Sequence, residues 1–91
     1  MSNLYHIFIK AKPETTITQV ETTMNLAVDW FRYDQKNWII YTTSDAKKWY
    51  ARLKPFVEPG GNIFICKFDA GDYFGYMSKE LWGWIEKYKG S

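Results

Sequence analysis

Only a few side chains in this sequence are of the types that carry out acid–base or nucleophilic chemistry. Among 91 residues there is one histidine, His6, and one cysteine, Cys66. A general base needs a neighbouring group that orients it, and the sequence around His6 offers none, so we expect a surface or partner-facing histidine. Cys66 ends the apolar run Ile63–Cys66, which favours a buried thiol because free cysteine packs as a small hydrophobic residue. A single cysteine also excludes an intramolecular disulfide and a cysteine-cluster zinc site.

The carboxylates best placed to hold a metal ion all lie in turn-like stretches. They are Asp34, Asp69 and Asp72, and aspartate is frequent in turns because its carboxylate bonds to the nearby backbone. We therefore expect structural roles for them. Ser44 has no histidine nearby in the sequence that would activate it, and it is expected to cap a helix. The sequence thus predicts no catalytic residue, no metal ligand and no cofactor.

A group of cations gives a clearer indication of a binding surface. The segment from Ser44 to Glu58 holds four basic and two acidic residues. Lys48 and Arg52 are four residues apart, which places them on one side of a helix. The residues expected to contact the phosphates of a nucleic acid are Arg32, Lys47, Lys48 and Arg52. The alternative is an ordinary solvated helix face.

Length and composition define the setting of these residues. The chain forms one domain, 1–91, and 46% of its residues are hydrophobic, enough for one core. Aromatic residues make up 20%, so some rings are expected on an interaction surface. A net charge of +2 gives only weak general attraction to nucleic acid, and any such site has to be local. No run is apolar enough for a membrane span or a signal peptide, and a reducing cytoplasm is expected.

Hydrophobic periodicity predicts strands and helices in alternation. The expected strands are Leu4–Lys10, Trp30–Tyr33, Trp38–Thr43, Ile63–Phe68 and Tyr73–Met77. The expected helices begin at Thr16 or Thr18, at Ser44 and at Ser78. The second of these helices should end near Lys54, because Pro55 cannot donate a helical hydrogen bond.

Two connectivities fit these elements. If Trp30–Tyr33 and Trp38–Thr43 form a hairpin, the order is βαββαβ; otherwise it is βαβαββ followed by a helix. Both lead to an α+β fold, a ferredoxin-like sandwich with one mainly antiparallel sheet, two helices on one face and a C-terminal helix. The other face of the sheet then lacks cover. The residues expected at a dimer or partner interface are His6, Phe8, Phe64, Phe68, Tyr73 and Tyr76.

A spaced pattern of residues covers most of the chain. Its members are Trp30 and Trp38, Ile39-Ile40, Thr43-Ser44, Ala46, Arg52, Leu53-Lys54-Pro55, the Pro59-Gly60 turn, Lys67, Gly75 and Trp84-Ile85. The stretch from Trp30 to Phe68 resembles the SinR-like proteins. These are small relatives of the CRISPR-associated endoribonuclease family, whose members act as the non-catalytic scaffold of the spacer integrase. The resemblance implies a ferredoxin-like fold and a homodimer formed through sheet and C-terminal contacts.

One position departs from that family. The wider family places an aspartate at the end of the first strand, where two copies across the dimer axis hold a divalent metal. The matching position here is Lys10, followed by Ala11. A lysine repels a hard cation and cannot ligate it. The sequence at Lys10 therefore argues against nuclease activity.

Three functions follow as expectations. The first is a non-catalytic nucleic-acid-binding or scaffold dimer of a mobile-element or defence-related system. The second is a protein-interaction module that inhibits or senses a defence system, and the third is a divalent-metal-dependent endonuclease. Salt-dependent binding to duplex, co-purification with a protein and metal-dependent cleavage, respectively, would distinguish them.

Overall fold

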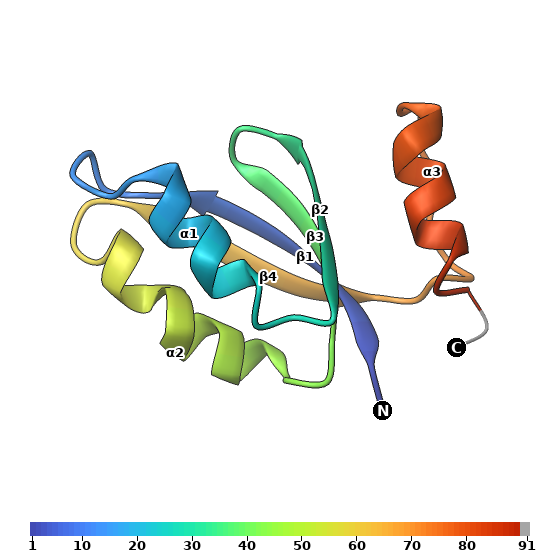
Figure 1. Ribbon diagram of the computed structural model, residues 1–91, viewed down its shortest axis with the longest axis horizontal. Helices are drawn as coiled ribbons and strands as arrows, with labels where there is room; N and C mark the ends of the chain where they lie inside the picture. The colour runs from blue at the N-terminus through green and yellow to red at the C-terminus, as the bar shows by residue number, and fades with distance from the viewer. Residues whose placement is uncertain (90–91) are drawn as a thin grey trace.

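Four antiparallel strands form one sheet in the order β2-β3-β1-β4 (Figure 1). The structure is a computed structural model that describes residues 1–89. The elements in chain order are β1 (Asn3–Lys10), α1 (Ile17–Met24), β2 (Asp29–Asp34), β3 (Asn37–Thr42), α2 (Ala46–Val57), β4 (Asn62–Phe68) and α3 (Lys79–Glu86). The fold is α+β with the ferredoxin-like arrangement expected from the sequence.

The β2–β3 hairpin decides between the two connectivities in favour of βαββαβ. Arg32 of β2 lies opposite Trp38 of β3, and a bulge follows before Asp34. The Asp34 carboxylate holds the turn by accepting hydrogen bonds from the Lys36 backbone N–H at 3.0 Å and from the Asn37 amide at 3.2 Å. The structural role expected for Asp34 is therefore confirmed.

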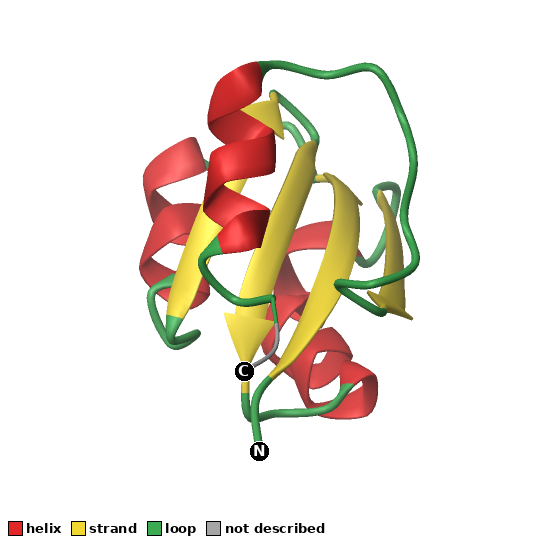
Figure 2. Ribbon diagram, turned by 90° about the vertical axis from the view of Figure 1, so that its right-hand side faces the viewer, coloured by secondary structure: helices red, strands yellow, loops and turns green. Residues whose placement is uncertain are grey.

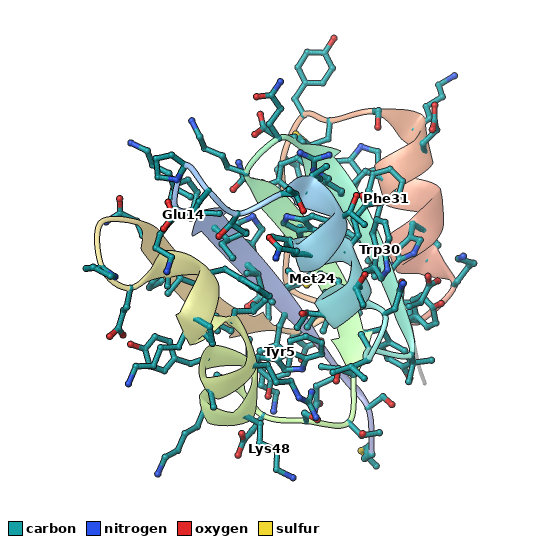
Figure 3. All side chains as sticks on the ribbon, turned by 60° about the vertical axis from the view of Figure 1, so that its left-hand side comes forward. Tyr5, Glu14, Met24, Trp30, Phe31 and Lys48 are labelled. Carbon is teal, nitrogen blue, oxygen red and sulfur yellow. The ribbon has the colours of Figure 1, made fainter. Side chains whose placement is uncertain are left out.

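The main core lies between the sheet and the α1–α2 pair. Its strand residues alternate along β1 and β3, and its helical residues recur with helical spacing, because both patterns place apolar side chains on one side of their element. They are Tyr5, Ile7, Ile9, Val20, Met24, Trp38, Ile40, Trp49, Leu53 and Val57. Figure 3 shows Met24 of α1 and Tyr5 of β1 within this layer.

A second core lies on the opposite face of the sheet, under α3. It is built from the alternate residues of β1 and β3, Leu4 and Ile39, and from Leu81, Trp84 and Ile85 of α3. Figures 1 and 2 show α3 on the side of the sheet away from α1 and α2, at the end of a long connection. The expectation that this face lacks cover is thus corrected in part, because the C-terminal helix folds back over one end of it.

Capping side chains start all three helices. Thr16 and Gln19 form the capping box of α1, the first of the two pairs considered, and the Ser78 hydroxyl accepts from the Leu81 N–H, as expected. At α2 the expectation was wrong by one residue, because Asp45 is the cap and its carboxylate accepts from the Lys48 N–H at 2.9 Å. Aspartate and serine are comparable N-caps, so local propensity alone does not choose between them.

The helix α2 also continues past Pro55, to Val57, where the sequence predicted an end near Lys54. Proline removes a single N–H donor, and here it stands in the last turn. The Glu58 N–H still bonds to the Lys54 carbonyl at 3.0 Å. One lost bond close to the end of a packed helix is not enough to stop it.

The strand predicted at Tyr73–Met77 is absent, and this segment is an irregular connection between β4 and α3. Its aromatic composition suits a strand, but a strand needs a neighbour that pairs with its backbone. Tyr73 instead stacks on Trp82 of α3 with 5.5 Å between ring centroids. At the start of the connection, the Asp69 carboxylate accepts from the Gly71 N–H at 2.7 Å, the turn role expected for it.

The thiol of Cys66 is exposed, which corrects the expectation of a buried cysteine. A short apolar run predicts burial only when both faces of its strand are covered. β4 is an edge strand, and Cys66 faces the side that α3 covers only in part. Within residues 1–89, no helix has the length and apolar character needed to cross a bilayer.

Candidate functional site

The part of the sheet that α3 leaves uncovered carries a group of apolar and aromatic side chains. In the pairing of β1 with β4, His6 lies opposite Cys66 and Phe8 lies opposite Phe64. Residues directly opposite each other on neighbouring strands project from the same face. We call these four residues the open face. It brings together three of the residues expected at an interface, His6, Phe8 and Phe64.

The exposure of side chains differs along this side of the sheet, because α3 covers only one end of it. The Phe64 side chain is 64% exposed, whereas His6 and Phe8 are half-buried. Phe68 pairs with Leu4 beneath α3 and contacts Tyr73 edge to face, with 6.4 Å between ring centroids. Phe68 and Tyr73 therefore belong to the second core. The remaining expected interface residue, Tyr76, is fully exposed on the connection before α3.

A small hollow of about 250 Å³ joins the open face to α3. His6, Cys66 and Tyr33 of the sheet line it, together with Phe74 and Met77 of the connection. Its volume is below the roughly 300–1,000 Å³ of typical small-molecule sites. The hollow is therefore better suited to receiving one or two side chains of a partner than to enclosing a cofactor.

The single histidine is hydrogen-bonded across the face. Nε2 of His6 and the hydroxyl of Tyr33 are 2.6 Å apart, and burial lowers the pKa of His6. Burial raises the pKa of Tyr33, and the negative charge of Asp34 raises it further. Both groups thus stay neutral near pH 7. The thiol of Cys66 contacts the Lys67 carbonyl at 3.5 Å, so the described contacts contain no cysteine–histidine pair of the kind that activates a nucleophile.

The expected phosphate-binding residues are divided between two places. Lys47 and Lys48 are exposed in the first turn of α2, and Figure 3 shows Lys48 at the outer end of that helix. Arg52 lies on the same helix with its guanidinium 4.8 Å from the Trp49 ring centroid. Arg32 stands apart from them, because β2 forms the far edge of the sheet while α2 packs on β4 and β1.

The guanidinium of Arg32 is held within its own hairpin. It donates to the Gln35 carbonyl at 2.9 Å and lies 5.4 Å from the Trp38 ring centroid. The nearby end of β1 carries Lys10, which is exposed. Within residues 1–89, no three histidine, cysteine or acidic side chains gather closely enough to hold a metal ion.

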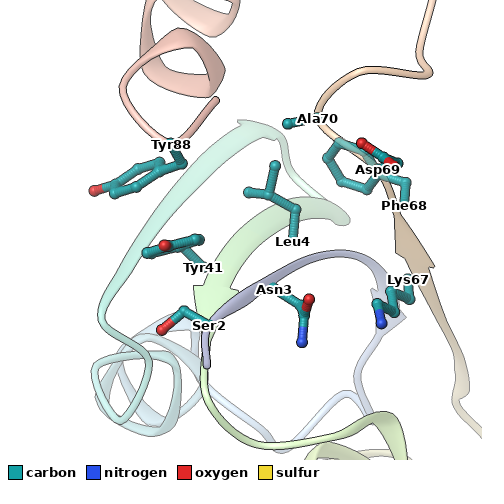
Figure 4. A pocket seen from close by; sticks show the side chains of 9 residues that line it. All are labelled: Ser2, Asn3, Leu4, Tyr41, Lys67, Phe68, Asp69, Ala70 and Tyr88. Atoms are coloured by element: carbon teal, nitrogen blue, oxygen red, sulfur yellow. The ribbon is translucent and has the colours of Figure 1, made fainter. Parts of the chain in front are cut away.

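A further hollow of about 530 Å³ lies at the start of β1 (Figure 4). Tyr41 and Tyr88 stack on one side of it with 4.0 Å between ring centroids, and Lys67 and Asp69 lie on the other side. Burial, together with a hydrogen bond to Asp29, raises the pKa of Tyr88 to about 12. The opposite charges of Lys67 and Asp69 favour no ligand of one sign, so this hollow indicates no particular chemistry.

The sequence did not indicate Cys66, Phe74 and Met77 as surface residues. A usable signal for Cys66 would have been the edge position of β4, which follows once βαββαβ is chosen. No local signal placed Phe74 and Met77 beside the sheet, because they were assigned to a strand. No protein-family model, no curated protein and no solved structure matches this chain.

Proposed function

We propose that this domain is a non-catalytic scaffold that pairs with a second copy of itself through β4 and the open face. The supporting observation is that an exposed aromatic side chain, Phe64, stands on an edge strand. β4 pairs with β1 on one side only, and within residues 1–89 its other side has no strand partner. Unpaired edges are ready templates for another strand.

A second copy suits this surface because β4 carries both the unpaired edge and two residues of the open face, Phe64 and Cys66. Two copies of β4 that pair antiparallel about their central residue, Ile65, would place Phe64 of each copy opposite Cys66 of the other. The same patch would then serve both subunits, as two-fold symmetry requires. The Phe64 side chain would be buried from water against the open face of the other copy. One continuous sheet would run through both copies.

Charge does not oppose this pairing. The net charge of each copy is only +2, so long-range repulsion between copies is weak. A contiguous apolar patch on a monomer usually marks an interaction site. The resemblance to SinR-like proteins also implies a homodimer, formed through sheet and C-terminal contacts, and it alone suggests a mobile-element or defence-related setting.

The oligomeric state tests the proposal. Light scattering at high micromolar concentration should give a dimer for the wild type and a monomer for Phe64→Glu. The matched control is Tyr76→Glu, which places the same charge at an exposed aromatic position away from β4 and should remain dimeric. Circular dichroism verifies that each variant is folded. A monomeric wild type, or a dimeric Phe64→Glu, would overturn the proposal.

Crosslinking tests the register. In Phe64→Cys, positions 64 and 66 both carry thiols, and mild oxidation should join the two copies efficiently. In Phe64→Cys/Cys66→Ser, each copy has only the thiol at position 64, which in this register faces a hydroxyl at position 66 of the other copy. That variant should crosslink poorly. Equal crosslinking of both variants would contradict pairing about Ile65.

Nucleic-acid binding along α2 is a second candidate function, favoured by the exposure of Lys47 and Lys48. Such binding would act through phosphates and carry little sequence preference. A protein partner that adds its own strand to β4 is a further alternative, and it predicts a monomeric wild type that captures that partner. The endonuclease alternative would need metal-ligating side chains, and within residues 1–89 of one copy no three histidine, cysteine or acidic side chains gather closely enough to hold a metal ion.

A further inference from the structure

We propose that a cavity between Lys10, Arg32 and Lys36 binds a phosphate group. The cavity has a volume of about 330 Å³ and lies between the end of β1, the first turn of α1 and the β2–β3 hairpin. The backbone joins these parts, since the Ile9 N–H donates to the Lys36 carbonyl at 2.8 Å. The site lies on the helix side of the sheet and does not depend on the proposed dimer surface.

The lining is cationic. Lys10, Arg32 and Lys36 contribute to it, and none of the residues that line it is acidic. The ion pairs of the described residues involve other lysines. Asp34 lies beside the group, and its single negative charge interacts with Lys36 and Arg32. Hydrogen bonds within the turn lower the pKa of Asp34, and these two cations help to lower it. Three cations around one cavity therefore lack a full counter-charge.

Two unpaired donors belong to residues in the cavity wall. Trp38 is wholly buried and its indole N–H has no hydrogen-bond partner, and the Arg32 Nε is buried and unpaired as well. In residues 1–89 there are three such side-chain atoms, and two of them are these. Buried donors without partners are rare and call for an explanation. Both atoms are shielded from solvent, so a phosphate oxygen would reach them only if a neighbouring side chain moved aside, and the cations therefore define the site.

The first turn of α1 adds to this preference. Thr16 and Ile17 line the cavity, so the positive end of the helix dipole lies beside it. The capping box occupies the N–H groups of Thr16 and Gln19. The N–H groups at the start of a helix otherwise lack intrahelical partners and favour phosphate. The helix start strengthens a site that the cations already define.

The volume limits the ligand. About 330 Å³ is near the lower end of small-molecule sites, which span roughly 300–1,000 Å³. It accommodates a phosphate with a small attached group, such as a sugar. A guanidinium fork and lysine ammonium groups are suited to phosphate oxygens. The phosphate could belong to a free nucleotide or to the end of a nucleic-acid strand, and the chemistry of recognition is the same.

Titrations followed by two-dimensional NMR test the site. The probes are inorganic phosphate, adenosine monophosphate, and a short single-stranded oligonucleotide with or without a 5′-phosphate. A phosphate-bearing probe should shift the Trp38 indole N–H resonance. Lys10→Gln/Lys36→Gln should weaken its binding by about tenfold per lysine removed, because each loses a charge-assisted hydrogen bond. The matched control, Lys79→Gln/Lys89→Gln, removes two exposed lysines near the two ends of α3, on the other side of the sheet, and should bind as wild type does.

The probes also separate the two sources. Preference for the 5′-phosphorylated oligonucleotide over its unphosphorylated form assigns the site to strand ends. Preference for the mononucleotide over both oligonucleotides assigns it to free nucleotides. Absence of binding to every probe at millimolar concentration, or equal weakening by the two double variants, would overturn the proposal. The open face does not enter this test, so a failed dimer proposal would leave its outcome unchanged.

Discussion

The carboxylate of Asp29, at the start of β2, accepts a hydrogen bond from the indole N–H of Trp84 in α3 at 3.0 Å, across 55 residues of sequence. The Tyr88 hydroxyl donates to the same oxygen, and the Lys87 ammonium lies 3.5 Å away. These contacts fix α3 over one end of the sheet. They therefore also determine how much of the open face remains exposed.

Removing this carboxylate should loosen α3. Asp29→Ala leaves the partly buried donors of Trp84 and Tyr88 without an acceptor, at a cost of about 1–3 kcal/mol in the free energy of unfolding. Urea denaturation followed by tryptophan fluorescence measures this loss. Asp72→Ala is the matched control, because Asp72 is exposed, and it should change stability by less than about 0.5 kcal/mol. Equal losses in the two variants would show that Asp29 does not anchor the helix.

The same carboxylate predicts a dependence on acid. Burial alone would raise the pKa of Asp29, but hydrogen bonds from Tyr88 and Trp30 and the charge of Lys87 lower it below its ordinary 3.8. A carboxylate with a lowered folded pKa stabilises the protein above its unfolded pKa, and this stability is lost as the pH falls through the folded value. The stability difference between wild type and Asp29→Asn should therefore be constant at neutral pH and shrink below about pH 4. A difference that grows in acid would contradict the assignment.

A second pH effect is expected from His6. Burial lowers its folded pKa below the ordinary 6.5, so the unfolded chain takes up a proton before the folded chain does. Stability should fall as the pH drops below about 6.5, and it should be unaffected by this group above that value. His6→Gln should flatten the stability profile between pH 7 and pH 5 relative to wild type. If the stability of wild type and of His6→Gln, measured by urea titration, falls in parallel as the pH drops, the pKa of His6 is the same in the folded and unfolded states.

The faces of β1 and the caps of α1 and α3 could be predicted because they depend on local pattern. Alternation predicted that His6 and Phe8 share the face opposite the α1–α2 pair, and the side chains of Thr16 and Ser78 supply acceptors for helix starts. The strand expected at Tyr73–Met77 failed because aromatic composition describes a surface that fits a sheet, whereas a strand also needs a partner.

The surfaces show a similar division between local and long-range information. The pairing of β1 with β4 groups His6, Phe8 and Phe64, and alternation alone suggested that group. Arg32 did not join the cations of α2, because only the strand order shows that β2 lies at the opposite edge. Lys10 and Lys36 line one cavity because the hairpin packs against the end of β1, which no sequence spacing encodes.

Trp38 should be one of the most sensitive core positions. Its side chain is wholly buried and contacts Trp30 with 4.8 Å between ring centroids. Trp38→Ala should lower the free energy of unfolding by about 3–5 kcal/mol, because it leaves a cavity between α1 and the sheet. Tyr76→Ala, at a fully exposed position, should change it by less than about 0.5 kcal/mol. A loss below about 1 kcal/mol for Trp38→Ala would mean that β3 is not central to the core.

Nucleic-acid binding along α2 makes a prediction about salt. Lys47 and Lys48 are exposed at the start of the helix, whereas Arg52 rests on the Trp49 ring, so the two lysines are the residues to change. If they contact phosphates of duplex DNA, Lys47→Gln/Lys48→Gln should reduce the slope of log affinity against log salt by about 0.9 per lysine. The Asp45 cap is preserved, because it uses the backbone N–H of Lys48.

Lys79→Gln, at an exposed lysine of α3, is the control and should leave the slope unchanged. Labelled duplex titrated between low and physiological salt gives the slopes. Identical slopes for all three proteins, or no binding by wild type at low salt, would remove α2 as a nucleic-acid surface and leave the self-pairing scaffold as the leading proposal for function.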